Sequence, residues 1–215
     1  MKVKWMGHAS FLITSEAGLK ILTDPYPHGS GLSYIPIKED IDIVIMSHDH
    51  FDHNNISLVP GKPQVIKGGG VKTVKGIQFK GIDTYHDGSQ GKERGANTAF
   101  CFSVDGIKLC HLGDLGHRLS QEQIAQIGNI DILFIPIGGT FTIDAKMAGT
   151  VIVDLKPKVA MPMHYKTAKC NWPLNTADDF VVDKKNVRRL DSSEIDFAAG
   201  SLPEGTEIVI LQPAE

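Results

Sequence analysis

One run of six residues, His48-Asp49-His50-Phe51-Asp52-His53, offers four side chains that can bind a metal cation. The spacing is H-x-H-x-D-H, and imidazoles combined with carboxylates are the donors that proteins present to zinc and similar ions. A single H-x-H pair is more typical of a solvated turn. The longer pattern, with further histidines and aspartates downstream, predicts a metal-dependent site.

The segment before this cluster must position it. Residues 41–46 are a short, β-branched apolar run, which is typical of a buried strand. A strand that ends in imidazoles and a carboxylate places them on a loop at the edge of a rigid sheet, within reach of solvent and substrate. We therefore expect the cluster at a sheet edge.

Four further predicted strands end in a histidine or an aspartate. They end in Thr23-Asp24-Pro25, Tyr85-His86-Asp87-Gly88, Leu112-Gly113-Asp114 and Pro162-Met163-His164-Tyr165. Each is weak alone, because a lone aspartate after a strand is usually a turn residue. Strand ends of one sheet converge, however, so five histidines and two aspartates would suffice for two cations, with Asp114 placed to bridge. Two neighbouring cations activate a shared water and polarise a substrate oxygen.

The rest of the chain alternates predicted strands and helices, without a linker rich in proline, glycine or serine. This pattern predicts one α/β domain spanning residues 1–215, with two packed sheets and helices on their outer faces. Asp105-Gly106 is a hairpin signal, and Ser120, Asp144 and Thr176 are predicted helix caps. The expected strands are residues 3–6, 10–14, 19–23, 41–47, 64–67, 71–74, 77–82, 98–104, 107–111, 131–137, 159–163 and 207–211.

Composition narrows the class of protein. The chain is 41% hydrophobic and 22% charged, with a formal net charge of −3, which gives no support to a nucleic-acid partner. No apolar run is long enough for a membrane helix, and residues 1–5 enter a strand pattern without a signal peptide. We therefore expect a cytoplasmic protein with a small-molecule substrate and no membrane partner, and the sequence leaves a homo-oligomer open. Cys101, Cys110 and Cys170 form no C-x-x-C unit and are odd in number, and Cys101 and Cys110, which lie in apolar strand patterns, are expected to be buried reduced thiols.

In chain order, Asp24, the H-x-H-x-D-H cluster, His86, Asp114 and His164 resemble the metallo-β-lactamase superfamily of metal-dependent hydrolases, over essentially the whole chain. The resemblance implies the four-layer αβ/βα sandwich of that superfamily, with two mixed sheets. Four short sequence motifs look most like those of a small branch near L-ascorbate-6-phosphate lactonase. Similar motifs occur in N-acylphosphatidylethanolamine phospholipase D. The four motifs are Trp5-Met6-Gly7-His8-Ala9-Ser10, Thr23-Asp24-Pro25, His111-Leu112-Gly113-Asp114 and Pro162-Met163-His164-Tyr165.

The resemblance implies a role for each matching residue. The implied metal ligands are His48, His50 and His86 for a first ion, Asp52, His53 and His164 for a second, and Asp114 as a bridge. Asp24 matches an aspartate that orients a ligating imidazole. Histidine at the second position of the cluster favours zinc over the iron of oxygen-reducing members, which typically carry glutamate there, while manganese, iron and nickel remain compatible.

The roles of three other histidines stay open. His8 lies in a turn and either lines the pocket or supports the turn. His111 is expected to support the site, and His117 to reach the cavity. Gly138-Gly139 is more typical of a turn than of a backbone that meets substrate.

The leading hypothesis is a dinuclear hydrolase that uses a metal-bound hydroxide on a small ester, lactone or phosphoester. Asp52 or Asp114 would orient the nucleophile or take its proton. Because the chain ends soon after His164, we expect it to lack the C-terminal helical domain of glyoxalase II-type thioesterases. The alternatives are a nuclease or phosphodiesterase, for which the basic candidates Lys92, Arg94, Lys166 and Lys169 are scattered, and a protein that stores or senses metal.

Overall fold

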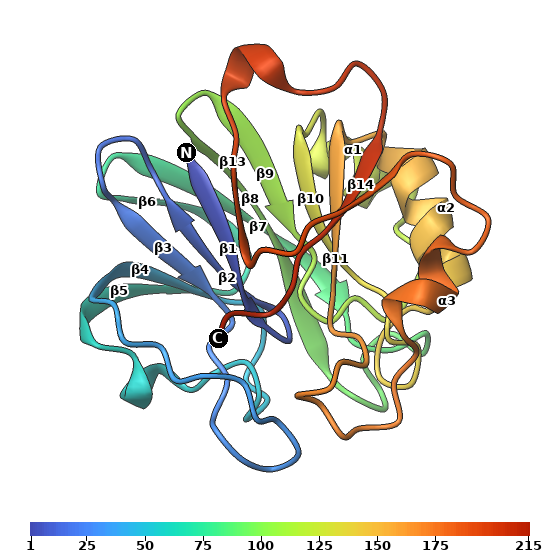
Figure 1. Cartoon of the computed structure of the whole chain (residues 1–215), viewed down its shortest axis with the longest axis horizontal. Helices are drawn as coiled ribbons and strands as arrows, with labels where there is room; N and C mark the ends of the chain where they lie inside the picture. Colours follow the sequence, from blue (N-terminus) through green and yellow to red (C-terminus); the bar gives the residue numbers. More distant parts are fainter.

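The protein, seen in a computed structural model that describes residues 1–215, consists of two packed β-sheets (Figure 1). One sheet has six strands in the order β13-β1-β2-β3-β4-β5, and the other has eight in the order β12-β14-β11-β10-β9-β8-β7-β6. Both sheets mix parallel and antiparallel pairs. The strands are β1 Lys2–Gly7, β2 Ser10–Thr14, β3 Lys20–Thr23, β4 Ile41–Met46, β5 Gly61–Lys67, β6 Gly70–Val74, β7 Ile77–Tyr85, β8 Ala96–Val104, β9 Ile107–His111, β10 Ile132–Pro136, β11 Val159–Met163, β12 Val187–Arg189, β13 Glu194–Asp196 and β14 Glu207–Ile210.

Alternating side chains along β1 to β4 bury both faces of the six-stranded sheet. Phe11 and Ile21 belong to a core cluster of 46 buried residues that both sheets share. The rings of Phe11 and Phe134 lie 4.3 Å apart between the sheets. Leu12 and Leu22 belong to a second cluster on the other face. The predicted antiparallel meander of β1, β2 and β3 is confirmed.

The eight-stranded sheet contains the predicted hairpin between β8 and β9. Its two turn residues, Asp105 and Gly106, have φ angles of 50° and 78°, which a type I′ turn requires. Beyond the hairpin, β9, β10 and β11 run parallel. Their carboxyl ends therefore meet at one edge of the sheet.

The three α-helices are α1 Gln121–Ile127, α2 Ala145–Leu155 and α3 Ala177–Val181. Each begins at its predicted cap, because the side chains of Ser120, Asp144 and Thr176 each accept a first-turn backbone N–H. None of these helices combines the length and the apolar character that crossing a bilayer requires.

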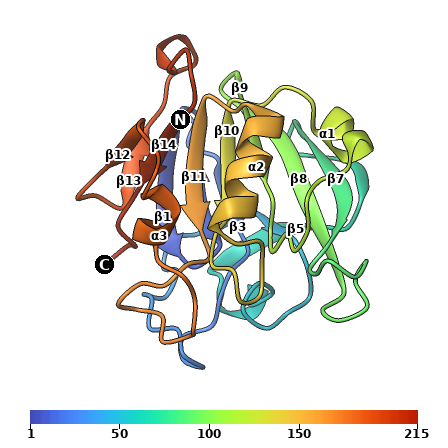
Figure 2. The ribbon, with the colours of Figure 1, turned by 90° about the vertical axis from the view of Figure 1, so that its right-hand side faces the viewer.

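The outer faces of the two sheets are covered differently. The α-helices lie against the eight-stranded sheet (Figure 2). On the six-stranded sheet, Leu12 and Val44 pack in one cluster with Tyr26 and Tyr34 of segment 25–40. This segment contains three prolines and two glycines, which disfavour a helix. The α-helices are therefore found on one outer face. Segment 25–40 and the short 3-10 helix η1 (Ile56–Leu58), whose Ile56 packs against the same cluster, cover the other.

Two short edge strands, β12 and β13, lie outside the sequence prediction. Each has three residues, and their sequences VRR and EID are mostly polar, so they lack an apolar period. All three cysteines are free, with Cys110 and Cys170 buried and Cys101 half-buried.

Six strands, parallel to one another within each sheet, deliver the polar residues to one edge of the sandwich. These are β1, β3 and β4 of one sheet and β7, β9 and β11 of the other. The residues that follow them within three positions are His8, Asp24, Ser47-His48, His86, Asp114 and His164. A backbone hydrogen bond from the His164 N–H to the His8 carbonyl, 3.0 Å, joins the two sheets at this edge.

Candidate metal centre

The first histidine cluster consists of His48, His50 and His86. Their ligand atoms all lie within 4.8 Å of one another. His48 and His86 are buried, whereas His50 is exposed. The structure thus joins the H-x-H pair after β4 to a histidine that follows β7 on the opposite sheet.

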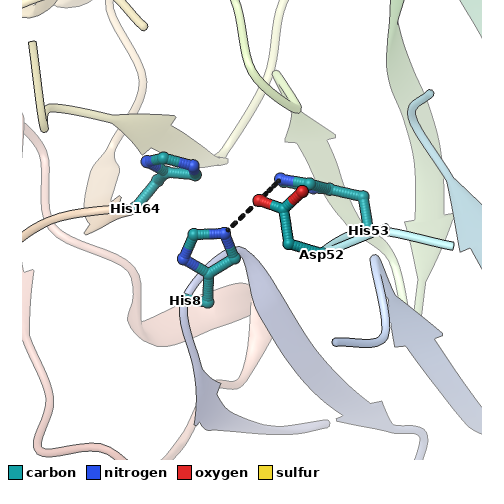
Figure 3. Close-up of side chains that lie close together, drawn as sticks. All are labelled: His8, Asp52, His53 and His164. Carbon is teal, nitrogen blue, oxygen red and sulfur yellow. Dashed lines mark hydrogen bonds and ion pairs between the residues drawn. The ribbon is translucent and has the colours of Figure 1, made fainter. Parts of the chain in front are cut away.

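The second cluster consists of His8, Asp52, His53 and His164, again within 4.8 Å of one another and all buried (Figure 3). Asp52 Oδ2 accepts a hydrogen bond from His8 Nε2 at 2.9 Å and lies 3.2 Å from His53 Nε2. The rings of His8 and His164 lie 4.1 Å apart between centroids. His8 therefore lies in the predicted turn after β1 and is also a member of this cluster.

Asp114 lies between the two clusters. Its Oδ2 is 3.2 Å from His86 Nε2 in the first cluster and from His53 Nε2 in the second, and 3.1 Å from His164 Nε2. The carboxylate is buried, and its other oxygen, Oδ1, has no hydrogen-bond partner. One carboxylate oxygen thus faces three imidazole nitrogens from both clusters.

Buried atoms without a partner are concentrated here. His48 Nε2, His53 Nε2 and Asp114 Oδ1 are all buried and form no hydrogen bond. Buried polar atoms are otherwise almost always paired, and leaving one unpaired costs about 1–3 kcal/mol. A divalent cation among these atoms would satisfy them, so the donor set of imidazoles and carboxylates fits a metal centre.

Burial sets the protonation of two of these imidazoles. Burial, together with the neighbouring His53 or His164, lowers the pKa of His48 to about 3 and that of His8 to about 4. Both rings are neutral at pH 7, which is the form in which imidazole binds a metal.

The pKa values of two other imidazoles, those of His53 and His86, are raised. Burial opposes their protonation, but the carboxylate of Asp114 raises the pKa of His86, and Asp114 with Asp52 raises that of His53 well above its ordinary value. A bound cation would take the place of a proton on each ring, since imidazole binds a metal in its neutral form.

Asp24 supports both clusters from behind. Its Oδ2 lies 2.9 Å from His53 Nδ1 and accepts the Ser47 hydroxyl hydrogen at 2.6 Å, while Oδ1 accepts the Ser47 N–H at 2.7 Å. Ser47 Oγ in turn lies 2.9 Å from His48 Nδ1. Although burial opposes ionisation, His53 holds the pKa of Asp24 below its ordinary value. One carboxylate therefore orients one imidazole directly and another through Ser47.

Three of these strand-end residues have a left-handed backbone. His8, Asp24 and His164 have φ angles of 53°, 35° and 51°. Such angles are uncommon for residues with a Cβ and mark sites where the surrounding structure enforces a turn.

Asn97 and Ser47 hold the centre in place and were not found by sequence reasoning. Asn97 Oδ1 accepts the Asp114 N–H at 3.0 Å, and its Nδ2 donates to the Leu112 carbonyl at 2.9 Å. A Cβ on Gly113 would lie 2.3 Å from Asn97 Oδ1 and 2.5 Å from the Ser47 Cβ, so this position requires glycine. Gly113 beside Asp114 was the one sequence signal of this close packing.

The remaining residues singled out in the sequence, His111, His117 and Gly138, contact the protein's own backbone. His111 Nε2 lies 2.9 Å from the Ala9 carbonyl, and its Nδ1 accepts the Gly113 N–H at 3.1 Å. His117 does not line the cavity. Its Nε2 accepts the Tyr85 N–H at 3.1 Å and its Nδ1 lies 2.8 Å from the Arg118 carbonyl, so both ring nitrogens are engaged by backbone. A Cβ on Gly138 would lie 2.2 Å from the His164 carbonyl, so the close approach there is to the protein's own chain.

A cavity of about 420 Å³ opens over the centre. It is lined by His50, Phe51, Asp52, His86, Glu93, Arg94, Asp114, Phe141, His164, Trp172 and Pro173. A larger hollow of about 940 Å³ lies near Trp5 and Arg189 and includes none of the clustered histidines. The chemistry is therefore assigned to the smaller cavity, which reaches both clusters.

Comparisons with known proteins agree with this architecture. Residues 2–164 match a family described as the Beta-lactamase superfamily domain. A UPF0173 metal-dependent hydrolase of Carboxydothermus hydrogenoformans is 34% identical over 205 residues, covering 83% of this chain and 88% of that protein. A solved structure from Thermotoga maritima, assigned to the Zn-dependent hydrolases of the metallo-β-lactamase superfamily, is 37% identical, with a TM-score of 0.80 and coverage of 98% of this chain and 97% of its own.

A more distant structure shares the fold alone. Igni18, a metallo hydrolase of Ignicoccus hospitalis, is 20% identical with a TM-score of 0.70, covering 100% of this chain and 96% of its own. The predicted sandwich of two mixed sheets is confirmed.

Proposed function

The chain belongs to the β-lactamase superfamily as a metal-dependent hydrolase, and we propose that it holds two divalent ions and hydrolyses a small ester, lactone or phosphoester. The position of Asp114 carries the proposal. A carboxylate oxygen within 3.2 Å of imidazole nitrogens from two clusters is suited to bridge two cations. The proposed ligands are His48, His50 and His86 for one ion and Asp52, His53 and His164 for the other.

The chain's own residues have distinct tasks in this proposal. Bound divalent ions would lower the pKa of a coordinated water and polarise the oxygen of the substrate. Asp52 lies at the cavity and is held by His8 Nε2 at 2.9 Å, so its carboxylate is placed to orient the attacking water and accept its proton. Asp24 and Ser47 keep the imidazoles of His53 and His48 in fixed orientations.

We propose zinc as the metal. Neutral imidazoles with a minority of carboxylates are typical zinc donors, and the Thermotoga maritima relative is assigned to Zn-dependent hydrolases. Manganese, iron and nickel share these donors and remain alternatives.

A nuclease or phosphodiesterase receives less support. The cavity has one lysine or arginine in its lining, Arg94, whereas a nucleic-acid groove would need several cations along it. The resemblance to the L-ascorbate-6-phosphate lactonase branch stays a prediction. We also propose that residues 1–215 act as one hydrolase domain, since both sheets share one core cluster.

The proposal is tested by elemental analysis of the purified protein together with turnover of lactones, carboxylic esters and phosphodiesters. We expect about two equivalents of metal and hydrolysis of an ester or a lactone. Turnover confined to phosphodiesters would support the nuclease alternative. Bound metal without turnover of any substrate would support metal storage instead.

A further inference from the structure

One wall of the cavity beside the metal centre is aromatic. Phe51, Phe141 and Trp172 line it, with ring centroids of Phe51 and Phe141 at 6.1 Å and 5.8 Å from that of Trp172. Phe51 lies inside the metal-binding motif, yet its side chain is 54% exposed. A phenylalanine that is exposed beside a metal centre is available to a ligand rather than to the core.

Trp172 is fixed in this wall. Its Nε1 donates to the Ser30 carbonyl at 2.9 Å, and a Cβ on Gly31 would lie 2.3 Å from that nitrogen. On the side of the metal centre its ring is 5.3 Å from the His8 ring and perpendicular to it. The wall is therefore an ordered surface that reaches from the mouth of the cavity to the second cluster.

Arg94 supplies the positive charge at the cavity, and Asp87 positions it. The Asp87 carboxylate accepts four backbone N–H groups of the following loop at 2.7–3.0 Å, from Ser89, Gly91, Glu93 and Arg94. The loop is thereby held in one shape, with Arg94 at the cavity.

The guanidinium itself has weak partners. It lies 3.4 Å from the Thr140 carbonyl, 3.9 Å from Glu93 Oε2 and 5.8 Å from the Phe141 ring centroid. Glu93 is engaged elsewhere, because its Oε1 accepts the Ser89 hydroxyl at 2.7 Å. A half-buried guanidinium with such partners is available to an anionic group of a ligand.

We propose that the substrate is a small carboxylic ester or lactone that carries both an aromatic ring and a free carboxylate, and this rests on the hydrolase function proposed above. The ring packs against Phe51 and Trp172, the carboxylate pairs with Arg94, and the scissile carbonyl lies toward Asp52 and Asp114. The cavity of about 420 Å³ is at the low end of the roughly 300–1,000 Å³ of small-molecule sites. Hydrolysis adds the oxygen of water to the acyl carbon, breaks the acyl C–O bond and transfers a proton to the departing alcohol, so it needs no other reactant.

Four matched methyl esters separate the two recognition elements. They are methyl butyrate, methyl 3-phenylbutyrate, monomethyl glutarate and monomethyl 3-phenylglutarate, which differ by a phenyl ring, a carboxylate or both. We expect kcat/KM to rise about tenfold with the ring and about fivefold with the carboxylate, as expected for one aromatic contact and one partly exposed ion pair.

Variants with matched controls assign each gain to its residue. Phe51→Ala should abolish the ring preference, while Leu58→Ala, an exposed apolar residue outside the cavity lining, should keep it. Arg94→Gln should abolish the carboxylate preference, while Lys92→Gln on the same loop should keep it.

A binding measurement separates this proposal from the hydrolase function. The probe is 3-phenylglutarate, added to the metal-free protein and followed by quenching of Trp172 fluorescence; Trp5 is 1% exposed and serves as an internal reference. We expect 3-phenylglutarate to bind at least about tenfold more tightly than glutarate, with the difference lost in Phe51→Ala.

Equal turnover of all four esters, with equal binding of the two diacids, would overturn the proposal and leave the hydrolase function standing. Preferential binding of 3-phenylglutarate without turnover of any ester would do the reverse. Faster turnover of bis(4-nitrophenyl) phosphate than of any ester would overturn the ester assignment in favour of a phosphodiesterase.

Discussion

The two clusters that Asp114 joins are supported very differently by the fold. In the first cluster, His50 is exposed, and Ser47 Oγ contacts His48 Nδ1 at 2.9 Å. In the second, every member is buried, His8 bonds Asp52, and the Asp24 carboxylate contacts His53 directly. The first side of the centre thus meets solvent, whereas the second is fixed by a buried polar network.

This difference shows that one short motif can supply side chains to two clusters with different surroundings. Residues 48–53 contribute to both clusters, but what lies behind each side chain comes from strands elsewhere in the chain. Preorganisation by such outer contacts typically changes metal affinity by about 10–100-fold. Substitutions that act on one cluster or on both therefore test whether the two clusters differ in how their surroundings support metal binding.

Asp114→Asn should have the largest effect, because it removes an anionic donor from both clusters at once while keeping the shape of the side chain. We expect activity to fall by roughly 10²-fold or more and both metals to bind less tightly. Metal analysis and kcat on this variant check the expectation. A variant with unchanged metal content and a rate within a few-fold of the parent would show that Asp114 does not bridge.

Asp24→Asn and Ser47→Ala form a matched pair that separates the clusters. Asp24 contacts His53 directly and His48 through Ser47, so Asp24→Asn should weaken binding of both ions by about 10–100-fold. Ser47→Ala removes the contact to His48 and one hydrogen bond to Asp24 but leaves the contact between Asp24 and His53, so it should weaken mainly the ion of the first cluster. Titration of the metal-free variants with zinc resolves the two affinities, and equal losses in both variants would contradict the asymmetry.

His8→Ala should lower turnover by about tenfold while both metals are retained. The reason is that His8 holds Asp52 but the proposed ligand set is complete without it, and loss of such an outer partner typically costs about 10–100-fold in activity. Loss of a full metal equivalent would instead make His8 a ligand, which its place in the second cluster allows.

The contribution of His53 and His86 to the pH dependence of stability should be opposite in metal-free and metal-loaded protein. The lowered pKa values of His8 and His48 act against it in the metal-free fold, because a buried neutral ring loses stability as pH falls below about 6.5. The raised pKa values of His53 and His86 stabilise the metal-free fold below the unfolded pKa of about 6.5, and this stabilisation is lost as pH rises through the folded pKa values. Bound metal replaces those protons and is favoured by higher pH. Urea unfolding across this range, with and without chelator, measures both trends. His86→Gln should remove only part of this contribution, because His53 of the second cluster keeps its raised pKa.

His117→Ala should have the smallest effect. Its ring bonds backbone outside the cavity, so we expect turnover within a few-fold and a loss of about 1 kcal/mol in the free energy of unfolding. A large loss of activity with normal stability would mean that this ring reaches the substrate.

Sequence reasoning could predict the ends of strands but not what packs behind them. His86, Asp114 and His164 follow apolar runs, so their convergence was predictable, and the structure brings them together. Ser47 and Asn97 were missed because serine and asparagine after or within a strand carry no metal-ligand signature, and their role depends on partners 23 and 17 residues away.

The outer layers and the cavity were harder to predict for a similar reason. Segment 25–40 covers a sheet through scattered side chains without a helical period. Arg94 reaches the cavity because Asp87 shapes the loop between them, which is a backbone effect that residue types alone do not reveal.

The left-handed backbone at His8, Asp24 and His164 sets a limit on how stable this chain can become while it stays active. Each such residue costs roughly 1–2 kcal/mol that glycine would avoid. Engineering for thermal stability alone would favour glycine at all three positions, and each exchange would delete an imidazole or carboxylate of the centre. Stability and catalysis therefore compete at the same three turns, as at other strained active sites.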